Sequence, residues 1–153
     1  MNRGRDRFII AALRSERLAI PLGHVSEVME NFRTFPIPRA PVFFPGVINS
    51  HGSPTPVLDL ASFLYGDPPA PDGTLLILDH RTATLALRID RVERIISADG
   101  PAEDDNTDNG LTNRTVFYNE SSIRTLNLEL LVEMLEQELS RRPASSTRSG
   151  APA

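Results

Sequence analysis

The chain has 153 residues, of which 40% are hydrophobic and 24% charged, and a formal net charge of −4. This composition is ordinary for one soluble globular domain, and the acidic balance argues against nucleic-acid binding, which usually requires a basic patch. The sequence holds no cysteine, so disulfides, thiolate nucleophiles and cysteine-ligated zinc sites are excluded.

The chain starts with a polar, arginine-containing segment, residues 1–7, which we expect to be flexible. The apolar run 8–13 that follows is too short for the core of a signal peptide or for a membrane span, which predicts a cytoplasmic protein. A second apolar run covers 18–22. The polar tip 14–17 between the two runs is typical of a β-hairpin.

Residues 46–60 read GVINSHGSPTPVLDL and form the most informative stretch of the sequence. Two apolar runs, 46–48 and 56–60, flank a polar corner that contains Gly52 and Pro54. Glycine tolerates a positive φ and proline lacks a backbone donor. The pattern therefore predicts two short strands joined by a tight turn.

An apolar pattern recurs in the chain with an offset of 67 residues. The segment 18–29 aligns with 85–96, and each copy is preceded by another apolar run, 8–13 or 75–78. The proline-rich connector 67–73 lies between the copies and is expected to mark the passage from one half to the other. Two copies predict two similar β subdomains rather than a solenoid, which needs more units. Chance similarity between apolar strands is the alternative.

The region 98–112 is acidic and irregular, as solvated loops commonly are. The spacing of its acidic residues is close to that of a calcium-binding loop. However, Asn109 stands where that loop requires glycine, and Thr115 where it requires a bidentate glutamate. The sequence therefore argues against calcium binding.

The last part of the chain predicts a hairpin and then a helix. Residues 115–118 and 123–126 flank a polar turn, and Asn127 is suited to cap a helix. The apolar residues that recur at helical spacing after this cap are Leu128, Leu131, Val132, Leu135 and Leu139. Pro143 is expected to follow the helix end, and the tail 141–153 is expected to be disordered.

The residue order in 46–60 is more specific than a hairpin requires. It resembles the signature G-V-I-N-x-x-G-x-x-x-P-V-x-D-L of CheW-like chemotaxis coupling domains, and the resemblance extends over residues 8–139. Further segments that resemble family elements are V-S-E-V at 25–28, P-R-A-P at 38–41, I-D-R-V at 89–92 and L-N-L-E at 126–129.

The resemblance implies a mainly β fold. It consists of two SH3-like, five-stranded β-barrel subdomains around a shared apolar core, with a C-terminal helix. We expect a single CheW-like domain over residues 8–140, with the connector near 67–73.

The resemblance also implies a non-catalytic adaptor. Such proteins couple the cytoplasmic tips of methyl-accepting chemoreceptors to the regulatory domain of the histidine kinase CheA. In the family, one barrel pairs with the kinase and the groove between the barrels takes the receptor's helical hairpin. This implies a cytoplasmic protein recruited to receptor arrays at the inner membrane, with no cofactor, metal, nucleic acid or membrane insertion. The alternative is a divergent scaffold of a non-flagellar pathway (pili, gliding or development) with an altered partner set.

Ten positions match the parts of the motifs expected to bind partners. They are Val25, Glu27, Val28, Gly46, Asn49, His51, Gly52, Asp90, Arg91 and Val92. For each valine, a place in the apolar core is an equally good interpretation. The chain departs from the family at Ser50-His51, where Leu-Arg is typical, and at Arg91, where glycine is common.

The departure at His51 has a chemical consequence. In the family, an arginine at this position tends to pair with the glutamate that corresponds to Glu27. Arginine carries a permanent charge on a planar fork, whereas an imidazole, with an unperturbed pKa of about 6.5, is mostly uncharged at neutral pH. We predict a weaker or pH-sensitive contact, with Arg39, Arg91 and Arg94 as other sources of positive charge. The alternative is that His51 is an exposed loop residue without consequence.

An enzyme and an RNA-binding barrel are the competing classes. His24, His51 and His80 follow no metal-ligand spacing, and no G-x-S-x-G elbow accompanies Ser50-His51. Asp59 fits a turn or strand-end pattern that needs no catalysis. The acidic balance and the lack of an aromatic RNA-binding motif argue against RNA. The sequence therefore predicts no enzymatic activity.

Overall fold

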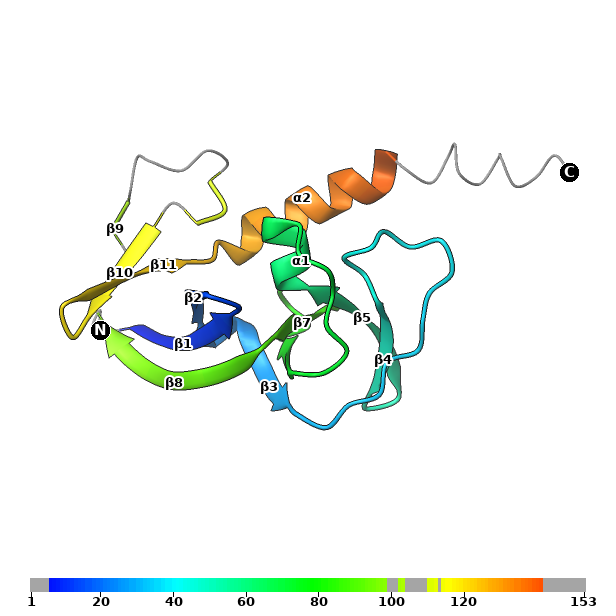
Figure 1. Cartoon of the computed structure of the whole chain (residues 1–153), viewed down its shortest axis with the longest axis horizontal. Coiled ribbons are helices and arrows are strands. Elements are labelled where there is room, and N and C mark those ends of the chain that lie inside the picture. Colours follow the sequence, from blue (N-terminus) through cyan, green and yellow to red (C-terminus); the bar gives the residue numbers. More distant parts are fainter. Residues whose placement is uncertain (1–5, 99–101, 104–109, 113, 142–153) are drawn as a thin grey trace, which may run out of the picture.

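The computed structural model describes residues 6–98, 102–103, 110–112 and 114–141, and there the chain is mainly β (Figure 1). The first half forms β1 (Asp6–Leu13), β2 (Glu16–Pro21), the 3-10 helix η1 (Leu22–His24), β3 (Val25–Met29), β4 (Gly46–Ser50), β5 (Ser53–Asp59) and α1 (Leu60–Tyr65). The second half forms β6 (Thr74–Leu78), β7 (Ala86–Ile89), β8 (Arg91–Ala98), β9 (Ala102–Glu103), β10 (Arg114–Tyr118), β11 (Ser121–Thr125) and α2 (Leu128–Arg141).

The described strands form two sheets that lie side by side, with α2 running above them past α1 (Figure 1). One sheet has the order β8-β1-β2-β11-β10-β9 and the other the order β3-β6-β7-β5-β4. We call them the six-stranded barrel and the five-stranded barrel. In the six-stranded barrel, β8 contacts β10 and so closes the curved sheet. The predicted mainly β fold of two SH3-like barrels with a C-terminal helix is confirmed, and β9 is a two-residue addition to it.

Apolar side chains form three clusters, one in each barrel and one between them. The six-stranded barrel encloses Phe8, Ile10, Ala19, Ile96, Ala98, Val116 and Ile123. The five-stranded barrel encloses Ile48, Val57, Leu75, Ile77 and Ala86. Successive side chains of a strand point to opposite faces, and the alternate residues Ile9 and Leu76 belong to the third cluster with the buried face of α2. This third cluster is the shared core, and it buries β1 and β6 on both faces.

The predicted repeat is present, but its two copies do not form separate barrels. The β1–β2 hairpin pairs Ile9 with Ile20, and the β6–β7 hairpin pairs Leu76 with Leu87, which is the same register 67 positions later. The third strand of each copy crosses over, because β3 pairs with β6 and β8 pairs with β1. The connector 67–73 therefore joins two elements of the five-stranded barrel. It lies between the two copies in the sequence, but it does not lead from one barrel to the other.

The repeat also extends beyond the pattern visible in the sequence. Gly46 pairs with Val57 in β4–β5, and 68 positions later Arg114 pairs with Thr125 in β10–β11. The parallel pairings of β5 with β7 and of β11 with β2 are likewise equivalent. Apart from the two-residue β9, each barrel thus combines the hairpin of one copy with three strands of the other, so the chain consists of two intertwined, equivalent halves.

Both α-helices begin at equivalent capping residues. Asp59 Oδ1 accepts a hydrogen bond from the Ser62 N–H at 3.0 Å, and Asn127 Oδ1 accepts one from the Leu130 N–H at 3.0 Å. Such a cap satisfies a backbone donor that lacks a partner in the first turn. The cap predicted at Asn127 is confirmed, whereas the strand predicted over 56–60 ends at Asp59 and Leu60 begins α1. No helix in the described part of the chain is long and apolar enough to cross a membrane.

Three predicted segments lie partly or wholly outside the described residues. β1 begins at Asp6, inside the segment 1–7 that we expected to be flexible. The positions with calcium-like spacing, 104–109, lie outside the described residues, and so does the tail 142–153. α2 ends at Arg141, one residue beyond the predicted domain boundary.

Candidate protein-interaction site

Glu27 and His51 meet at one end of the five-stranded barrel. Glu27 Oε1 lies 2.9 Å from His51 Nε2. Glu27 is on β3 and His51 follows β4, and these are the two outer strands of the sheet, so the contact depends on the sheet curling its edges together. The side chains of Glu27 and His51 are 37% and 80% exposed, so solvent screening leaves the pair little stabilising effect on the fold. A partner protein can reach both groups.

The turn that carries His51 has two residues in the left-handed region. His51 has a φ of 50° and Gly52 a φ of 84°. This is the geometry of a type I′ turn, whose twist matches that of the flanking antiparallel strands. Asn49 Oδ1 accepts a hydrogen bond from the Gly52 N–H at 2.9 Å. Asn49 and Gly52 therefore shape the turn that presents His51.

Gly46 is buried at the start of β4, beneath the irregular segment 30–45. Phe35 and Val47 exchange two backbone hydrogen bonds of 2.8 Å there. A Cβ atom on residue 46 would collide with the carbonyl oxygen of Phe35. Gly46 therefore allows two backbones to approach closely, which is a structural role.

The three candidate valines differ in their exposure. Val28 is 45% exposed on the outer strand β3. Val25 and Val92 are partly buried against the shared core, at equivalent positions of the two copies. The surface interpretation therefore fits Val28, and the core interpretation fits the other two.

Asp90 is held by backbone and side-chain hydrogen bonds. Its Oδ2 accepts one from the Arg14 N–H at 2.7 Å, and its Oδ1 accepts one from Arg88 Nη2 at 3.1 Å. Its own N–H donates to the Ala12 carbonyl at 2.9 Å. These bonds fix the β1–β2 turn against β7, so the structure gives Asp90 a structural role.

A buried charge cluster surrounds Arg88, and the spacing patterns of the sequence did not predict it. The Arg88 side chain is almost fully buried; its Nη1 lies 3.6 Å from Asp59 Oδ2 and its Nη2 lies 3.1 Å from Asp90 Oδ1. Its Nε donates to the carbonyl oxygen of Asp72 in the connector. A buried ion is costly unless it is paired, so these acceptors explain how Arg88 is tolerated. The available signal was an arginine inside an otherwise apolar strand.

Arg91 belongs to a different surface from Glu27. It is exposed at the start of β8, and its Nη2 lies 3.3 Å from Glu93 Oε2. Arg94 Nη1 donates to the Tyr118 hydroxyl at 3.4 Å. Neither arginine pairs with Glu27, so two of the three predicted alternative sources of charge, Arg91 and Arg94, are engaged in the six-stranded barrel. The third, Arg39, lies in the irregular segment between β3 and β4. The candidate residues therefore fall into two groups, one at the Glu27–His51 end and one around the start of β8.

The histidines are dispersed and make separate contacts. His24 Nδ1 lies 2.8 Å from Thr82 Oγ1, and His80 lies beside Asp79 at 3.9 Å. Hydrogen bonds from Arg81 hold the pKa of Asp79 well below its usual range, so this carboxylate stays charged. Within the described ranges, no three His, Asp or Glu side chains are grouped so that they could hold a metal ion.

A hollow of about 680 Å³ lies where the chain passes from one barrel to the other. Its walls come from the start of β1, from η1 and from the start of α2, with Phe8, Leu22 and Leu128 among the apolar residues. The strand residues that line it belong to β1, β2, β10 and β11 of the six-stranded barrel, and η1 leads from this hollow to β3 of the five-stranded barrel. Its mixed lining is chemically suited to an amphipathic segment.

Comparisons with known proteins agree with this architecture. The family model described as the CheW-like domain matches residues 7–136. Among solved structures, the scaffolding protein TtCheW from Thermoanaerobacter tengcongensis is similar, with a TM-score of 0.72 and 21% sequence identity over 84% of this chain and 88% of that chain. At this identity the likeness shows the fold. A comparison with curated proteins gave no match.

Proposed function

Because the chain belongs to the CheW-like domain family, whose model covers residues 7–136, we propose that it couples methyl-accepting chemoreceptors to the histidine kinase CheA. The coarser assignment is a chemotaxis-type adaptor that acts through protein partners. The observation that carries the finer proposal is the exposed Glu27–His51 pair, 2.9 Å apart. Its two positions correspond to the glutamate and arginine that tend to pair near the partner surfaces in the family.

On this proposal, the Glu27–His51 end of the five-stranded barrel contacts the regulatory domain of the kinase. Val28 supplies exposed apolar area beside the polar pair, a combination found in many protein interfaces. Gly46, Asn49 and Gly52 contribute by holding the turn that presents His51. The contact requires no chemical step.

The receptor contact is proposed for the hollow beside η1. An amphipathic helix can place its apolar face against Phe8 and Leu22, while polar groups at the rim, such as Asn127, set its register. Val25, which directly follows η1, packs against the shared core, and Val92 packs against the same core from β8. We further propose that the protein is cytoplasmic and is recruited to receptor arrays at the inner membrane.

A divergent scaffold of a non-flagellar chemosensory pathway is the second candidate function. It is favoured by the two departures from the family pattern, His51 in place of arginine and Arg91 in place of glycine. Both side chains are exposed, so each changes a surface that a partner can contact. Such a pathway would control pili, gliding or development through a related kinase.

The test is calorimetric binding of the full-length chain to purified regulatory domains of candidate kinases and to receptor tip fragments encoded beside it. We expect binding to one kinase and one receptor. Glu27→Arg should weaken the kinase contact roughly tenfold or more, because a hydrogen bond to a charged group contributes about 1.5–3 kcal/mol.

The matched control is Glu120→Arg, which changes an exposed glutamate in the β10–β11 turn of the other barrel. This control should leave kinase binding unchanged. The adaptor proposal would be refuted if the chain bound none of the kinase regulatory domains and none of the receptor fragments. Binding to the kinase of a non-flagellar system alone would establish the second candidate.

A further inference from the structure

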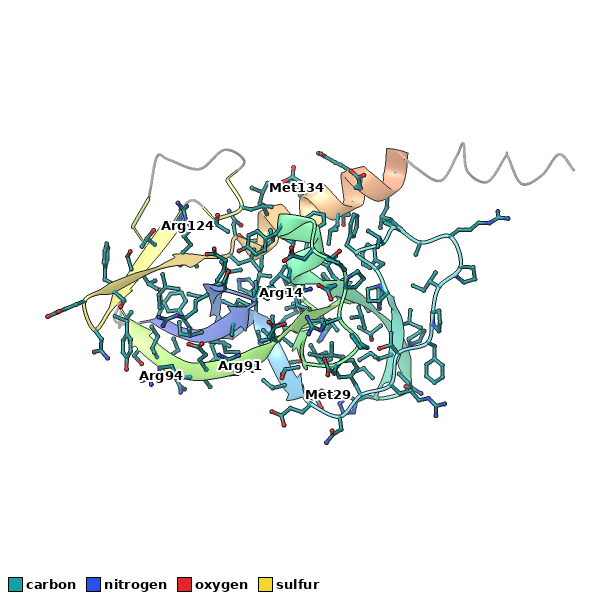
Figure 2. All side chains as sticks on the ribbon, in the orientation of Figure 1. Arg14, Met29, Arg91, Arg94, Arg124 and Met134 are labelled. Carbon is teal, nitrogen blue, oxygen red and sulfur yellow. The ribbon has the colours of Figure 1, made fainter. Side chains whose placement is uncertain are left out.

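Arginine side chains gather at one end of the six-stranded barrel. A hollow of about 500 Å³ there is lined by residues of β1, β2, β8, β10 and β11. Its charged residues are Arg17, Arg91, Glu93 and Arg94, so two positive charges are in excess in a chain of net charge −4. Figure 2 shows Arg91 and Arg94 along the same strand, β8. We call this hollow the arginine groove.

Glu93 shows that the arginine groove accommodates a carboxylate. Its Oε1 lies 3.7 Å from Arg17 Nη1 and its Oε2 lies 3.3 Å from Arg91 Nη2. The register between β1 and β8 shifts here, and a bulge of this kind re-aims the side chain of the extra residue. Each guanidinium carries five N–H donors, so one carboxylate leaves most of them available.

Arg94 extends the positive charge toward the β10–β11 turn. Its guanidinium carbon lies 5.9 Å from the centre of the Tyr118 ring, and its Nη1 donates to the Tyr118 hydroxyl at 3.4 Å. These contacts orient the side chain without neutralising it. Within the described residues, no carboxylate is paired with Arg94. Its guanidinium can therefore bind a carboxylate of another molecule.

The fold does not require this charge. The equivalent end of the five-stranded barrel has the same strand pairing and the same bulge in β3, yet Glu27 stands at the position that corresponds to Arg94. His24 corresponds to Arg91, and Thr84 corresponds to Arg17. The two barrel ends therefore share the same backbone arrangement but carry side chains of opposite charge. The positive charge of the arginine groove is thus not required for folding.

We propose that the arginine groove docks an acidic segment of a partner protein, with Arg91 and Arg94 binding its glutamate or aspartate carboxylates. A carboxylate-bearing chain is favoured because the groove already holds the carboxylate of Glu93, and because the planar guanidinium fork binds carboxylates with two parallel hydrogen bonds. This contact lies on the other barrel from the proposed kinase contact and does not depend on it.

The proposal is tested by nuclear magnetic resonance on the full-length, nitrogen-15-labelled chain. A blocked hexaglutamate peptide is the probe, and hexaglutamine is the uncharged control peptide. We expect saturable shifts in β8 and the β10–β11 turn with hexaglutamate alone. The double variant Arg91→Glu, Arg94→Glu should lose affinity by about tenfold or more and gain affinity for hexalysine.

The matched control is Arg33→Glu, which removes an exposed arginine that lies over Phe35 on the five-stranded barrel. It should bind hexaglutamate like the original chain. If the double variant fails to fold, Arg94→Gln serves in its place. The proposal is overturned if no saturable shifts occur, if the control loses as much affinity as the variant, or if an oligothymidylate or phosphatidylserine vesicles bind the same residues more tightly than hexaglutamate. Binding of the double variant to the kinase is measured in parallel. Because the kinase contact is proposed for the other barrel, this measurement tests the adaptor proposal independently of the arginine groove.

Discussion

His51 determines how the Glu27 carboxylate is held at one barrel end. Its ring nitrogen lies 2.9 Å from the Glu27 carboxylate, at the tip of a turn that solvent reaches freely. Arginine at this place would offer a planar fork that binds a carboxylate through two parallel hydrogen bonds, whereas one imidazole nitrogen makes a single contact. The residue at this backbone position therefore decides how firmly Glu27 is held.

His51→Arg should strengthen kinase binding a few-fold, because a guanidinium fork can hold the Glu27 carboxylate through two parallel hydrogen bonds. Calorimetric titration measures this, with Asn119→Arg in the equivalent turn of the other barrel as the control, which should leave kinase binding unchanged. An unchanged affinity of His51→Arg for the kinase would contradict the prediction.

At the scale of elements, Arg88 links parts of the chain that are distant in sequence. Its guanidinium reaches Asp59, which caps α1, and Asp90, which precedes β8. The hydrogen bond from Arg88 to Asp72 fixes the connector against β7. The proline-rich connector thus owes its path to one buried side chain as well as to its own stiffness.

Arg88→Met should destabilise the fold by roughly 3–5 kcal/mol, because Asp59 and Asp90 would lose their shared cation in a buried setting. Urea unfolding monitored by circular dichroism measures the change. Arg81→Met is the control, since Arg81 pairs with Asp79 in an exposed turn and solvent screening should make its loss far less costly. Equal losses of stability for the two variants would show that the buried cluster contributes no more than an exposed ion pair.

The strand exchange determines how the whole molecule holds together. Each barrel takes a hairpin from one half and three strands from the other, with β9 as a fourth in the six-stranded barrel, and the shared core packs against both barrels. No barrel can close until both halves are present. The two barrels should therefore unfold in one cooperative transition.

Fragments 1–70 and 71–153 test this dependence. We expect neither fragment to fold as a monomer, because each would expose the strand edges that the other half covers. Mixed or co-expressed, they should assemble into a complex with the spectrum of the intact chain. Sedimentation and circular dichroism measure the outcome. A monomeric, cooperatively folded fragment would show that the exchange is not needed for stability.

Local periodicity was enough to predict most strands and the C-terminal helix. The runs at 8–13, 18–22 and 75–78 are apolar because both faces of these strands are buried, and Asn127 is a recognisable cap. The Glu27–His51 contact was also anticipated, because the resemblance supplied a pair that the structure brings to 2.9 Å. Its role in binding partners stays a prediction.

The features that escaped prediction depend on contacts between distant residues. The apolar residues of β3 and β8 are spaced so that either strand could pair in either sheet. Only the three-dimensional structure shows that β3 pairs with β6 and β8 with β1, which exchanges them between the two halves. α1 is too short for a helical period to stand out. The burial of Arg88 follows from carboxylates that lie far away or across a turn, and no spacing rule points to them together.

Intertwining also constrains how such a protein can be inherited. A recombination event that replaced one half with a foreign sequence would leave both barrels with unmatched strands, so the interiors of the two halves must evolve in concert. Residues at the ends of the barrels can change independently of each other, as Glu27 and Arg94 at corresponding positions illustrate. A duplicated ancestor could in this way acquire two unlike docking faces while its interior remained a single heritable unit.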